Sequence, residues 1–278
     1  MSVTAPARLA LVYITGPGHC GSTLLNLLLN GHSRILGLSE VETIGEHLRS
    51  NAGDSVLDDP FWRAVADRYE RLTGESFSSL SLPAVSAARI GRLDAAQIEA
   101  WNRPNRALFE CIAQESGAEV LVDASKSWQR LALLSKGLGL DLRVIHLQRD
   151  GRAVYNSYAR KYQRPVFALT KWPKFTIGAL RLKRRLPSSV WLDLRYEDLA
   201  KDPHATLQRV CDFLGLDYEP AMLRYREQPN LGLGGNRMAA ASDEAIRLDE
   251  RWKTELSPGR RLVFGLLFGW LNRKLGYR

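Results

Sequence analysis

The amino-acid sequence predicts a three-layer α/β/α fold with a central parallel sheet, formed by a single domain over residues 1–278. Two patterns lead to this prediction. Short apolar runs that are typical of buried strands alternate with helix-like segments, as in parallel sheets covered on both faces. The first apolar run also leads into a glycine-rich, P-loop-like turn. With 45% hydrophobic and 25% charged residues, the composition is that of a globular protein with one large core.

Strands and helices are expected to follow one another along most of the chain. Strands are predicted at the apolar runs 9–14, 35–38, 119–122, 142–147 and 190–194. Helices are predicted over residues 24–29, 128–136, 150–162 and 203–214. A mostly helical insertion is expected at about residues 53–117, with Asp94 as a helix cap and a surface excursion or lid over 73–92. The apolar stretch 262–271 is shorter than the ~20 residues that span a bilayer, and it predicts a core-facing C-terminal helix.

Charge and cysteine usage limit the partners and the compartment. An excess of 39 basic over 30 acidic residues gives a net charge of +9, which favours anionic partners such as nucleotides, acidic substrates or membrane surfaces. The spacing of Cys20, Cys111 and Cys211 fits neither a disulfide framework nor a zinc site, which indicates a reducing compartment. With no apparent secretory signal, we expect a cytoplasmic protein. No nucleic-acid-binding signature is present, so nucleic acid is not an expected partner.

The turn after the first strand, residues 16–23, reads Gly-Pro-Gly-His-Cys-Gly-Ser-Thr and has the spacing of a phosphate-binding loop. Such a loop directs backbone N–H groups at an anion, and the start of the following helix adds about half a positive charge. The lysine that normally contacts the β- and γ-phosphates of a nucleoside triphosphate is replaced by Ser22. The loop therefore indicates a nucleotide without a triphosphate, and a plain tight turn between strand and helix is the alternative.

A second alternative for this loop is a cysteine-dependent phosphatase. A cysteine near a helix start, such as Cys20, can be a nucleophile because its pKa is lowered there. Those enzymes carry an arginine six residues after the cysteine, where this chain has Asn26. The phosphatase alternative therefore lacks its phosphate-binding group.

Polar residues follow four of the predicted strands. The glycine loop follows the first strand, Glu40 the second, Lys126 the third and Arg149 the fourth. The carboxyl ends of parallel strands meet at one edge of the sheet, where ligands bind in such folds. Any single one of these residues can be a helix cap or a solvated loop residue. Together they predict a site with an anion-binding loop, a carboxylate and two cations.

These motifs resemble those of the sulfotransferases that use 3'-phosphoadenosine 5'-phosphosulfate (PAPS), in the style of the tyrosylprotein and carbohydrate branch. Residues 16–25 resemble the 5'-phosphosulfate loop of that family, and residues 149–157 resemble its 3'-phosphate element, an arginine followed eight residues later by a serine. Further likeness lies in a lysine-bearing turn, an R-Y-E-D-L…F-L-G segment and a C-terminal section that closes over the nucleotide, at residues 122–127, 194–216 and 236–252. The resemblance covers nearly the whole chain except about 53–117.

The resemblance implies transfer of a sulfuryl group from PAPS to a hydroxyl or amine of a small-molecule, carbohydrate or peptide acceptor, without a metal. Adenosine 3',5'-bisphosphate is then the other product. The implied catalytic residues are Glu40 as general base, Lys126 as the cation at the sulfuryl group, and His19. The implied donor-binding residues are Gly18, His19, Cys20, Gly21, Ser22, Thr23, Arg149, Ser157, Tyr196 and Arg237.

The sequence departs from the family pattern in the loop. His19 stands where a lysine or arginine is usual, and Cys20 replaces a serine. A histidine contributes either as a protonated cation or as a neutral hydrogen-bond donor, whereas arginine is always charged. Lys126 or Arg34 can supply the missing charge instead. His32 and His47 are alternative bases.

Two further questions remain open from the sequence. The alternative function is a P-loop nucleotide-binding or kinase-like protein, against which the missing loop lysine argues. Residues 160–185 are rich in Lys and Arg, with Trp172 and Phe175 between them. This segment is either a solvated helix face or a docking surface for an anionic acceptor, a membrane or an acidic peptide.

Overall fold

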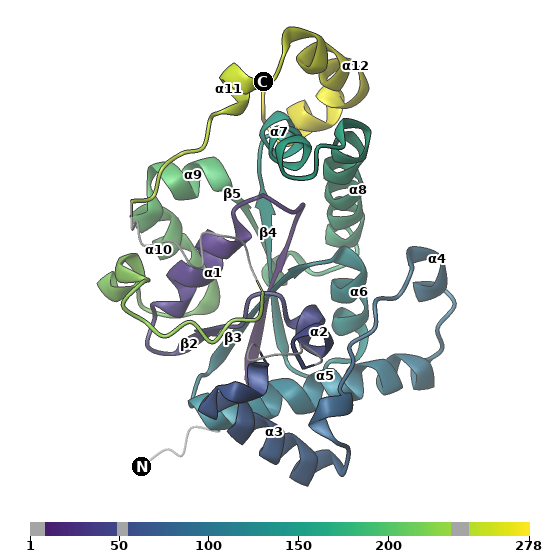
Figure 1. Ribbon diagram of the computed structural model, residues 1–278, viewed down its shortest axis with the longest axis vertical. Helices are drawn as coiled ribbons and strands as arrows, with labels where there is room; N and C mark the ends of the chain where they lie inside the picture. The colour runs from purple at the N-terminus through teal and green to yellow at the C-terminus, as the bar shows by residue number, and fades with distance from the viewer. Residues whose placement is uncertain (1–8, 49–54, 235–244) are drawn as a thin grey trace.

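A parallel five-stranded sheet forms the centre of the computed structural model, which describes residues 9–48, 55–234 and 245–278 (Figure 1). The strand order is β2-β3-β1-β4-β5. All adjacent strands are parallel, and Leu11 of β1 pairs with Leu121 of β3 and Leu142 of β4. The strands lie within a few residues of the predicted apolar runs, at Ala10–Thr15 (β1), Ile35–Gly37 (β2), Val120–Lys126 (β3), Asp141–Gln148 (β4) and Trp191–Arg195 (β5).

Helices cover both faces of this sheet, because successive side chains of a strand point to opposite sides. Leu11 and Tyr13 of β1 pack into one buried layer, whereas Val12 and Ile14 pack into the other. The first layer includes α3 (Pro60–Thr73), α5 (Ala95–Ser116) and α6 (Trp128–Gly137). The second includes α1 (Ser22–Asn30), α9 (Tyr196–Lys201) and α10 (Pro203–Leu214). The predicted three-layer α/β/α fold is confirmed.

Residues 55–116 are largely helical, as expected for this part of the chain. Helix α5 begins after Asp94, whose carboxylate accepts a hydrogen bond of 2.8 Å from the N–H of Gln97. The stretch 73–92 contains a 3-10 turn and the short helix α4 (Ala87–Ile90). Leu80 and Leu82 anchor this stretch in the core, so it is more than a surface excursion. Its assignment as an insertion within a single domain stays a prediction.

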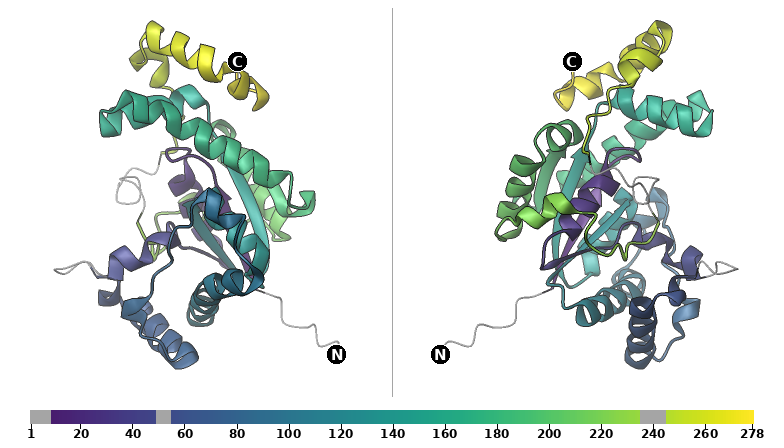
Figure 2. Two further views of the ribbon diagram at one scale, coloured as in Figure 1. Left: turned by 90° about the vertical axis from the view of Figure 1, so that its right-hand side faces the viewer. Right: turned by 60° about the vertical axis from the view of Figure 1, so that its left-hand side comes forward.

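A third buried cluster joins α7 (Gly151–Tyr162), α8 (Pro165–Lys183) and α12 (Pro258–Lys274). Both views in Figure 2 show α12 lying across α7 and α8, away from the sheet. Phe264 and Leu271 are buried against them, but the other side of α12 is exposed. The expectation of a core-facing C-terminal helix is therefore only half right. No helix in the described ranges combines the length and apolarity needed to cross a membrane.

The remaining elements are short. Helix α2 (Ile44–Leu48) follows β2 and α11 (Trp252–Glu255) precedes α12. Single 3-10 turns lie at Val41–Thr43, Val56–Asp58, Phe77–Ser79, Ser188–Val190 and Pro220–Arg224.

Candidate functional site

The glycine loop between β1 and α1 is held from two sides by tyrosines. A Cβ atom at Gly21, where φ is 97°, would lie 2.5 Å from the ring of Tyr196. A Cβ atom at Gly18 would lie 2.2 Å from the hydroxyl of Tyr158. Only glycine therefore fits at these two positions. Helix α1 starts at Ser22, and Gly21 provides no side-chain cap, so no capping side chain occupies the end of the helix that favours anions.

Lys126 and Glu40 meet beside this loop, where β3 ends and shortly after β2. The Lys126 Nζ atom donates to Glu40 Oε1 at 2.7 Å and to the carbonyl of Ala124 at 3.0 Å. Both side chains line a cleft of about 510 Å³ that Gly18 and Tyr158 also border. The sequence prediction that these strand ends converge is confirmed by this contact.

The backbone around the cleft is conformationally restricted. Within the described chain, His19, Ser39 and Lys126 are three of the four non-glycine residues with φ in the left-handed region. Ser39 is held there by Asn26, which accepts from its N–H at 3.1 Å and donates to its hydroxyl at 3.2 Å. Such positions cluster at functional sites because surrounding contacts must over-determine them. Asn26, which replaces the phosphatase arginine, thus orients the segment that carries Glu40.

A second carboxylate in the cleft, Glu42, was not predicted. Its N–H donates to the hydroxyl of Ser125 at 3.1 Å, and Ser125 in turn donates to the buried Asp123. Asp123 also accepts from Arg130 Nε at 3.0 Å. Burial, and then the charge of Asp123, raise the pKa of Glu42 to about 7. No local sequence pattern indicates this shift in pKa, because the shift depends on burial next to Asp123, more than 80 residues away along the chain.

His19 and Cys20 are both uncharged in the free protein. Burial, followed by the charges of Lys161 and Arg149, lowers the pKa of His19 to about 4. Its ring packs edge-on against Tyr158, with ring centroids 4.6 Å apart. Of the two roles considered for His19, a neutral hydrogen-bond donor is therefore favoured. Burial raises the pKa of the Cys20 thiol, which removes the basis for a nucleophilic cysteine.

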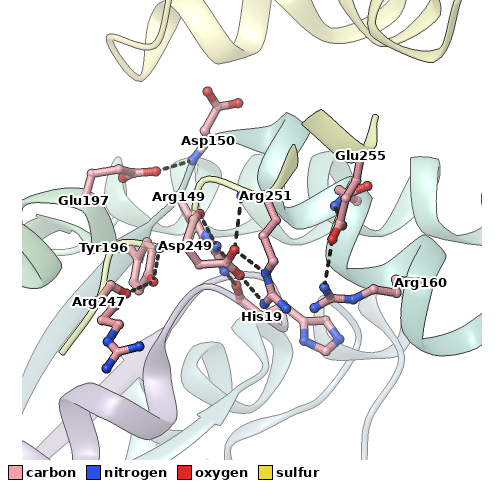
Figure 3. A network of polar contacts seen from close by, with 11 residues as sticks. His19, Arg149, Asp150, Arg160, Tyr196, Glu197, Arg247, Asp249, Arg251 and Glu255 are labelled. Carbon is pink, nitrogen blue, oxygen red and sulfur yellow. Dashed lines mark hydrogen bonds and ion pairs between the residues drawn. The ribbon is translucent and has the colours of Figure 1, made fainter. Parts of the chain in front are cut away.

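Arg149, at the end of β4, is enclosed by the loop and by the chain that precedes α11 (Figure 3). Its guanidinium donates to the carbonyl of His19 at 2.8 Å and pairs with Asp249 Oδ2 at 3.2 Å. It also lies 4.2 Å from the centroid of the Tyr196 ring. The Tyr196 hydroxyl accepts from the N–H of Asp249 at 3.0 Å. The described chain offers no acceptor to the buried Arg149 Nε atom.

The other predicted 3'-phosphate residues are only partly placed. Ser157 is buried in α7, the helix that directly follows Arg149. On the same helix, Asn156 donates to Glu255 at 2.6 Å and Arg160 pairs with Glu255 at 3.4 Å. Arg237 lies outside the described residues. The sequence did not predict that the C-terminal carboxylates Asp249 and Glu255 contact this region, although alternating acids and cations at 249–255 were visible.

His32 and Arg34, suggested from the sequence as an alternative base and an alternative cation, lie away from the cleft. His32 Nε2 contacts the carbonyl of Asp217 at 3.0 Å, and Arg34 pairs with Glu119. Both precede β2, at the amino edge of the sheet, which corrects their suggested roles as base and as cation. His47 lies on α2, whose Gly45 and Glu46 line the cleft, and it stays an alternative base.

Comparison with known proteins places these features in a wider context. Mouse carbohydrate sulfotransferase 4 is 26% identical in a 156-residue alignment that covers 47% of this chain and 40% of that protein. Human carbohydrate sulfotransferase 2 is 28% identical in a 175-residue alignment that covers 46% of this chain and 33% of that protein. The chain thus spans less than half the length of these curated relatives.

Solved structures show the same fold over the whole chain. The sulfotransferase domain of the Synechococcus olefin synthase has a TM-score of 0.65 at 20% identity, covering 100% of this chain and 98% of that one. The sulfotransferase domain from the curacin biosynthetic pathway has a TM-score of 0.59 at 21% identity, covering 99% of each chain. Residues 12–220 match the sulfotransferase family, and this stretch includes the loop, Glu40, Lys126 and Arg149. The chain belongs to the sulfotransferase family.

Proposed function

We propose that this protein transfers a sulfuryl group from PAPS to a hydroxyl of a carbohydrate-like acceptor, with an amine as the second acceptor chemistry, and releases adenosine 3',5'-bisphosphate. The observation that carries the proposal is the 2.7 Å contact between Lys126 and Glu40 on the wall of the cleft. Sulfuryl transfer needs a cation near the leaving oxygen and a base near the acceptor hydroxyl. This pair supplies both groups next to an anion-binding loop.

The donor is assigned to the loop and to Arg149. Backbone N–H groups of residues 18–23, with the hydroxyls of Ser22 and Thr23, would bind the 5'-phosphosulfate, and neutral His19 would add a donor. The 3'-phosphate is assigned to Arg149, Ser157 and Arg237, with Tyr196 against the adenosine. The residues present fit an anion here, because Arg149 Nε is buried without an acceptor among the described residues. The 3'-phosphate would replace Asp249 as the partner of Arg149.

The acceptor is assigned to the rest of the cleft. Its lining includes three carboxylates, Glu40, Glu42 and Glu46, against the single cation Lys126. The uncharged polar residues of this lining are Thr43, Ser81, Ser125, Ser127 and Gln129. Such a wall favours a neutral or cationic molecule rich in hydrogen-bonding groups over an anionic one. The names of the carbohydrate sulfotransferase relatives support a sugar hydroxyl as the acceptor.

The reaction follows from the positions of these groups. Glu40 accepts the proton of the acceptor hydroxyl while the acceptor oxygen bonds to sulfur. The bond between sulfur and the 5'-phosphate oxygen breaks, and Lys126 and the loop N–H groups stabilise the charge that develops on that oxygen. Lys126 must turn from Glu40 toward the sulfuryl group for this, which frees the Glu40 carboxylate to act as a base. No step requires a metal ion.

The compartment and the competing function belong to the same proposal. Cys20, Cys111 and Cys211 are buried free thiols, which supports a reducing, cytoplasmic location. A kinase-like function is not favoured, because Ser22 replaces the phosphate-binding lysine and the family match is to sulfotransferases.

Two measurements test the proposal. Calorimetry is expected to show that adenosine 3',5'-bisphosphate binds more tightly than adenosine 5'-monophosphate, and than ATP with magnesium. Incubation with radiolabelled PAPS and a panel of sugars, amino sugars, phenols and peptides is expected to label a sugar. Equal affinity for all three nucleotides would overturn the donor assignment, and labelling of a phenol or peptide alone would overturn the acceptor assignment.

A further inference from the structure

Two segments of the chain carry many cations and no acidic residue. Residues 151–192 contain ten Lys and Arg residues and residues 256–278 contain five, without one Asp or Glu in either. They hold fifteen of the 39 basic residues of the chain and none of its 30 acidic residues. These segments include α7, α12 and α8, whose first part packs with the other two at one end of the molecule, while its last part packs against α6 (Figures 1 and 2). The α12 end carries the exposed cations Arg260, Arg273 and Lys274. The cations at 181–185 lie at the other end of α8, where Lys183 pairs with Asp193.

Helix α12 presents an exposed apolar face at the same end. Of the eight large hydrophobic side chains exposed in the described chain, five lie on this helix: Leu262, Val263, Leu266, Leu267 and Trp270. Leu262, Leu266 and Trp270 are four residues apart and therefore share one side of the helix. We call the five residues the α12 outer face. Because Phe264 and Leu271 are buried on the opposite side, α12 is apolar on both sides but covered on only one.

We propose that the α12 outer face docks on the surface of an anionic lipid bilayer. A helix that lies in a membrane interface combines leucine and tryptophan on its buried side with flanking Lys and Arg that attract anionic headgroups. The α12 outer face has this composition, since Arg260, Arg273 and Lys274 are exposed at its two ends. The inference is independent of the proposed reaction, because none of these residues lines the cleft.

Charge also argues against a second copy of this chain as the occupant. A symmetric dimer through the α12 outer face would bring together two copies of the exposed cations that flank it, Arg260, Arg273 and Lys274. Like charges placed face to face oppose association. An anionic membrane instead satisfies both the apolar face and the surrounding charge. Docking would also hold α7 and α8 near the bilayer, and these helices supply Tyr158 and Phe175 to the cleft wall.

Sedimentation of the full chain with lipid vesicles tests the proposal. Binding to phosphatidylcholine vesicles with about 30% phosphatidylglycerol is expected to be at least tenfold stronger than to phosphatidylcholine alone, and to weaken as salt is added. Leu266→Glu is expected to reduce this binding by about tenfold or more, because it places a charge in the interface. The matched control is Leu72→Glu on α3, a similarly exposed leucine (57% against 76%), which should bind like the wild type.

Tryptophan fluorescence gives a second readout. Of the seven tryptophans, all within the described residues, Trp270 is the exposed one, at 53%. Its emission is expected to shift to shorter wavelength with anionic vesicles, and Trp270→Phe should remove the shift while vesicle binding persists. Equal binding to neutral and anionic vesicles, or equal effects of Leu266→Glu and Leu72→Glu, would overturn the proposal. The proposal would also be overturned if the protein binds no vesicles but self-associates, and if Leu266→Glu abolishes this self-association.

Discussion

Two pairs of a cation and a carboxylate lie near the carboxyl edge of the sheet, and they differ in how accessible they are. The Lys126 and Glu40 side chains are 15% and 32% exposed and face the cleft. The Arg149 and Asp249 side chains are 7% and 22% exposed, and the guanidinium also bonds to the loop carbonyl of His19. The first pair can separate by side-chain rotation. The second is part of the packing between the loop and the C-terminal chain.

This difference predicts different consequences of mutation. Breaking a partly exposed ion pair changes stability less than breaking a buried one, because removing one partner of a buried pair leaves an uncompensated charge. Changes at Lys126 or Glu40 should therefore affect the chemical step with the fold intact. Changes at Arg149 should affect nucleotide binding and stability together.

The largest expected effect is on turnover in Glu40→Gln. Without a carboxylate to accept the acceptor proton, kcat should fall by about 10²- to 10⁴-fold, the usual scale for a lost general base. Affinity for adenosine 3',5'-bisphosphate and the melting temperature should stay near wild type. Glu46→Gln, which changes an exposed carboxylate on the same cleft wall, is the control and should keep most activity. Full activity in Glu40→Gln would show that Glu40 is not the general base and would leave His47 as the candidate.

Arg149→Ala should have the next largest effect, on donor binding. Loss of its charge-assisted hydrogen bonds is expected to weaken adenosine 3',5'-bisphosphate by about tenfold to a hundredfold in calorimetry. Adenosine 5'-monophosphate, without a 3'-phosphate, should lose little. The control is Arg143→Ala, in the strand β4 that precedes Arg149, where Arg143 is paired with Asp141 at the start of the strand. An equal loss of affinity for both nucleotides would show that Arg149 does not bind the 3'-phosphate.

Local sequence patterns predicted the elements well but not the long-range contacts. Helix α10 has the predicted bounds, because apolar period, Pro203 and Gly215 all mark them. His32 and Arg34 looked close to the loop along the chain. The nine residues of α1, however, carry the backbone ~14 Å back to the amino edge of the sheet. The pairing of Arg149 with Asp249 joins residues 100 positions apart and leaves no local signal.

Glu42 shows what happens to a cleft carboxylate that lacks a cation partner like Lys126. Its pKa is raised to about 7, so ionisation destabilises the folded state relative to the unfolded chain. As the pH rises from about 4.5 to about 7, the wild type should lose stability relative to Glu42→Gln, and the difference should stay constant above that range. The variant should therefore be more stable at pH 8 by about 1–3 kcal/mol in denaturant titrations.

The pH dependence distinguishes this explanation from a simple packing effect. At pH 4, where Glu42 is protonated in both states, the two proteins should be nearly equally stable. Glu46→Gln should show no comparable difference at either pH. A gain in Glu42→Gln that is the same at pH 4 and pH 8 would contradict the role of ionisation.

Asp249→Asn is expected to have a smaller effect, and it tests whether the Asp249 carboxylate competes with the nucleotide for Arg149. Removing the negative charge beside Arg149 leaves the guanidinium available to a 3'-phosphate, so adenosine 3',5'-bisphosphate should bind about three- to tenfold more tightly. Adenosine 5'-monophosphate should be unaffected in the same calorimetric titration. Weaker binding of the bisphosphate would mean that Asp249 mainly positions the C-terminal chain.

The smallest expected effect concerns His19, whose loop position lies between the two pairs. Because its pKa is lowered to about 4, the imidazole is neutral in the free protein over the range from about pH 6 to pH 8. His19→Asn keeps a neutral donor and tolerates the left-handed φ of 62°. Calorimetric affinity for adenosine 3',5'-bisphosphate should therefore change by less than about threefold and stay independent of pH in both proteins. If the affinity of the wild type increases toward pH 6 and that of His19→Asn does not, His19 becomes protonated when the nucleotide binds. In the absence of that result, the positive charge at the sulfuryl group comes from Lys126.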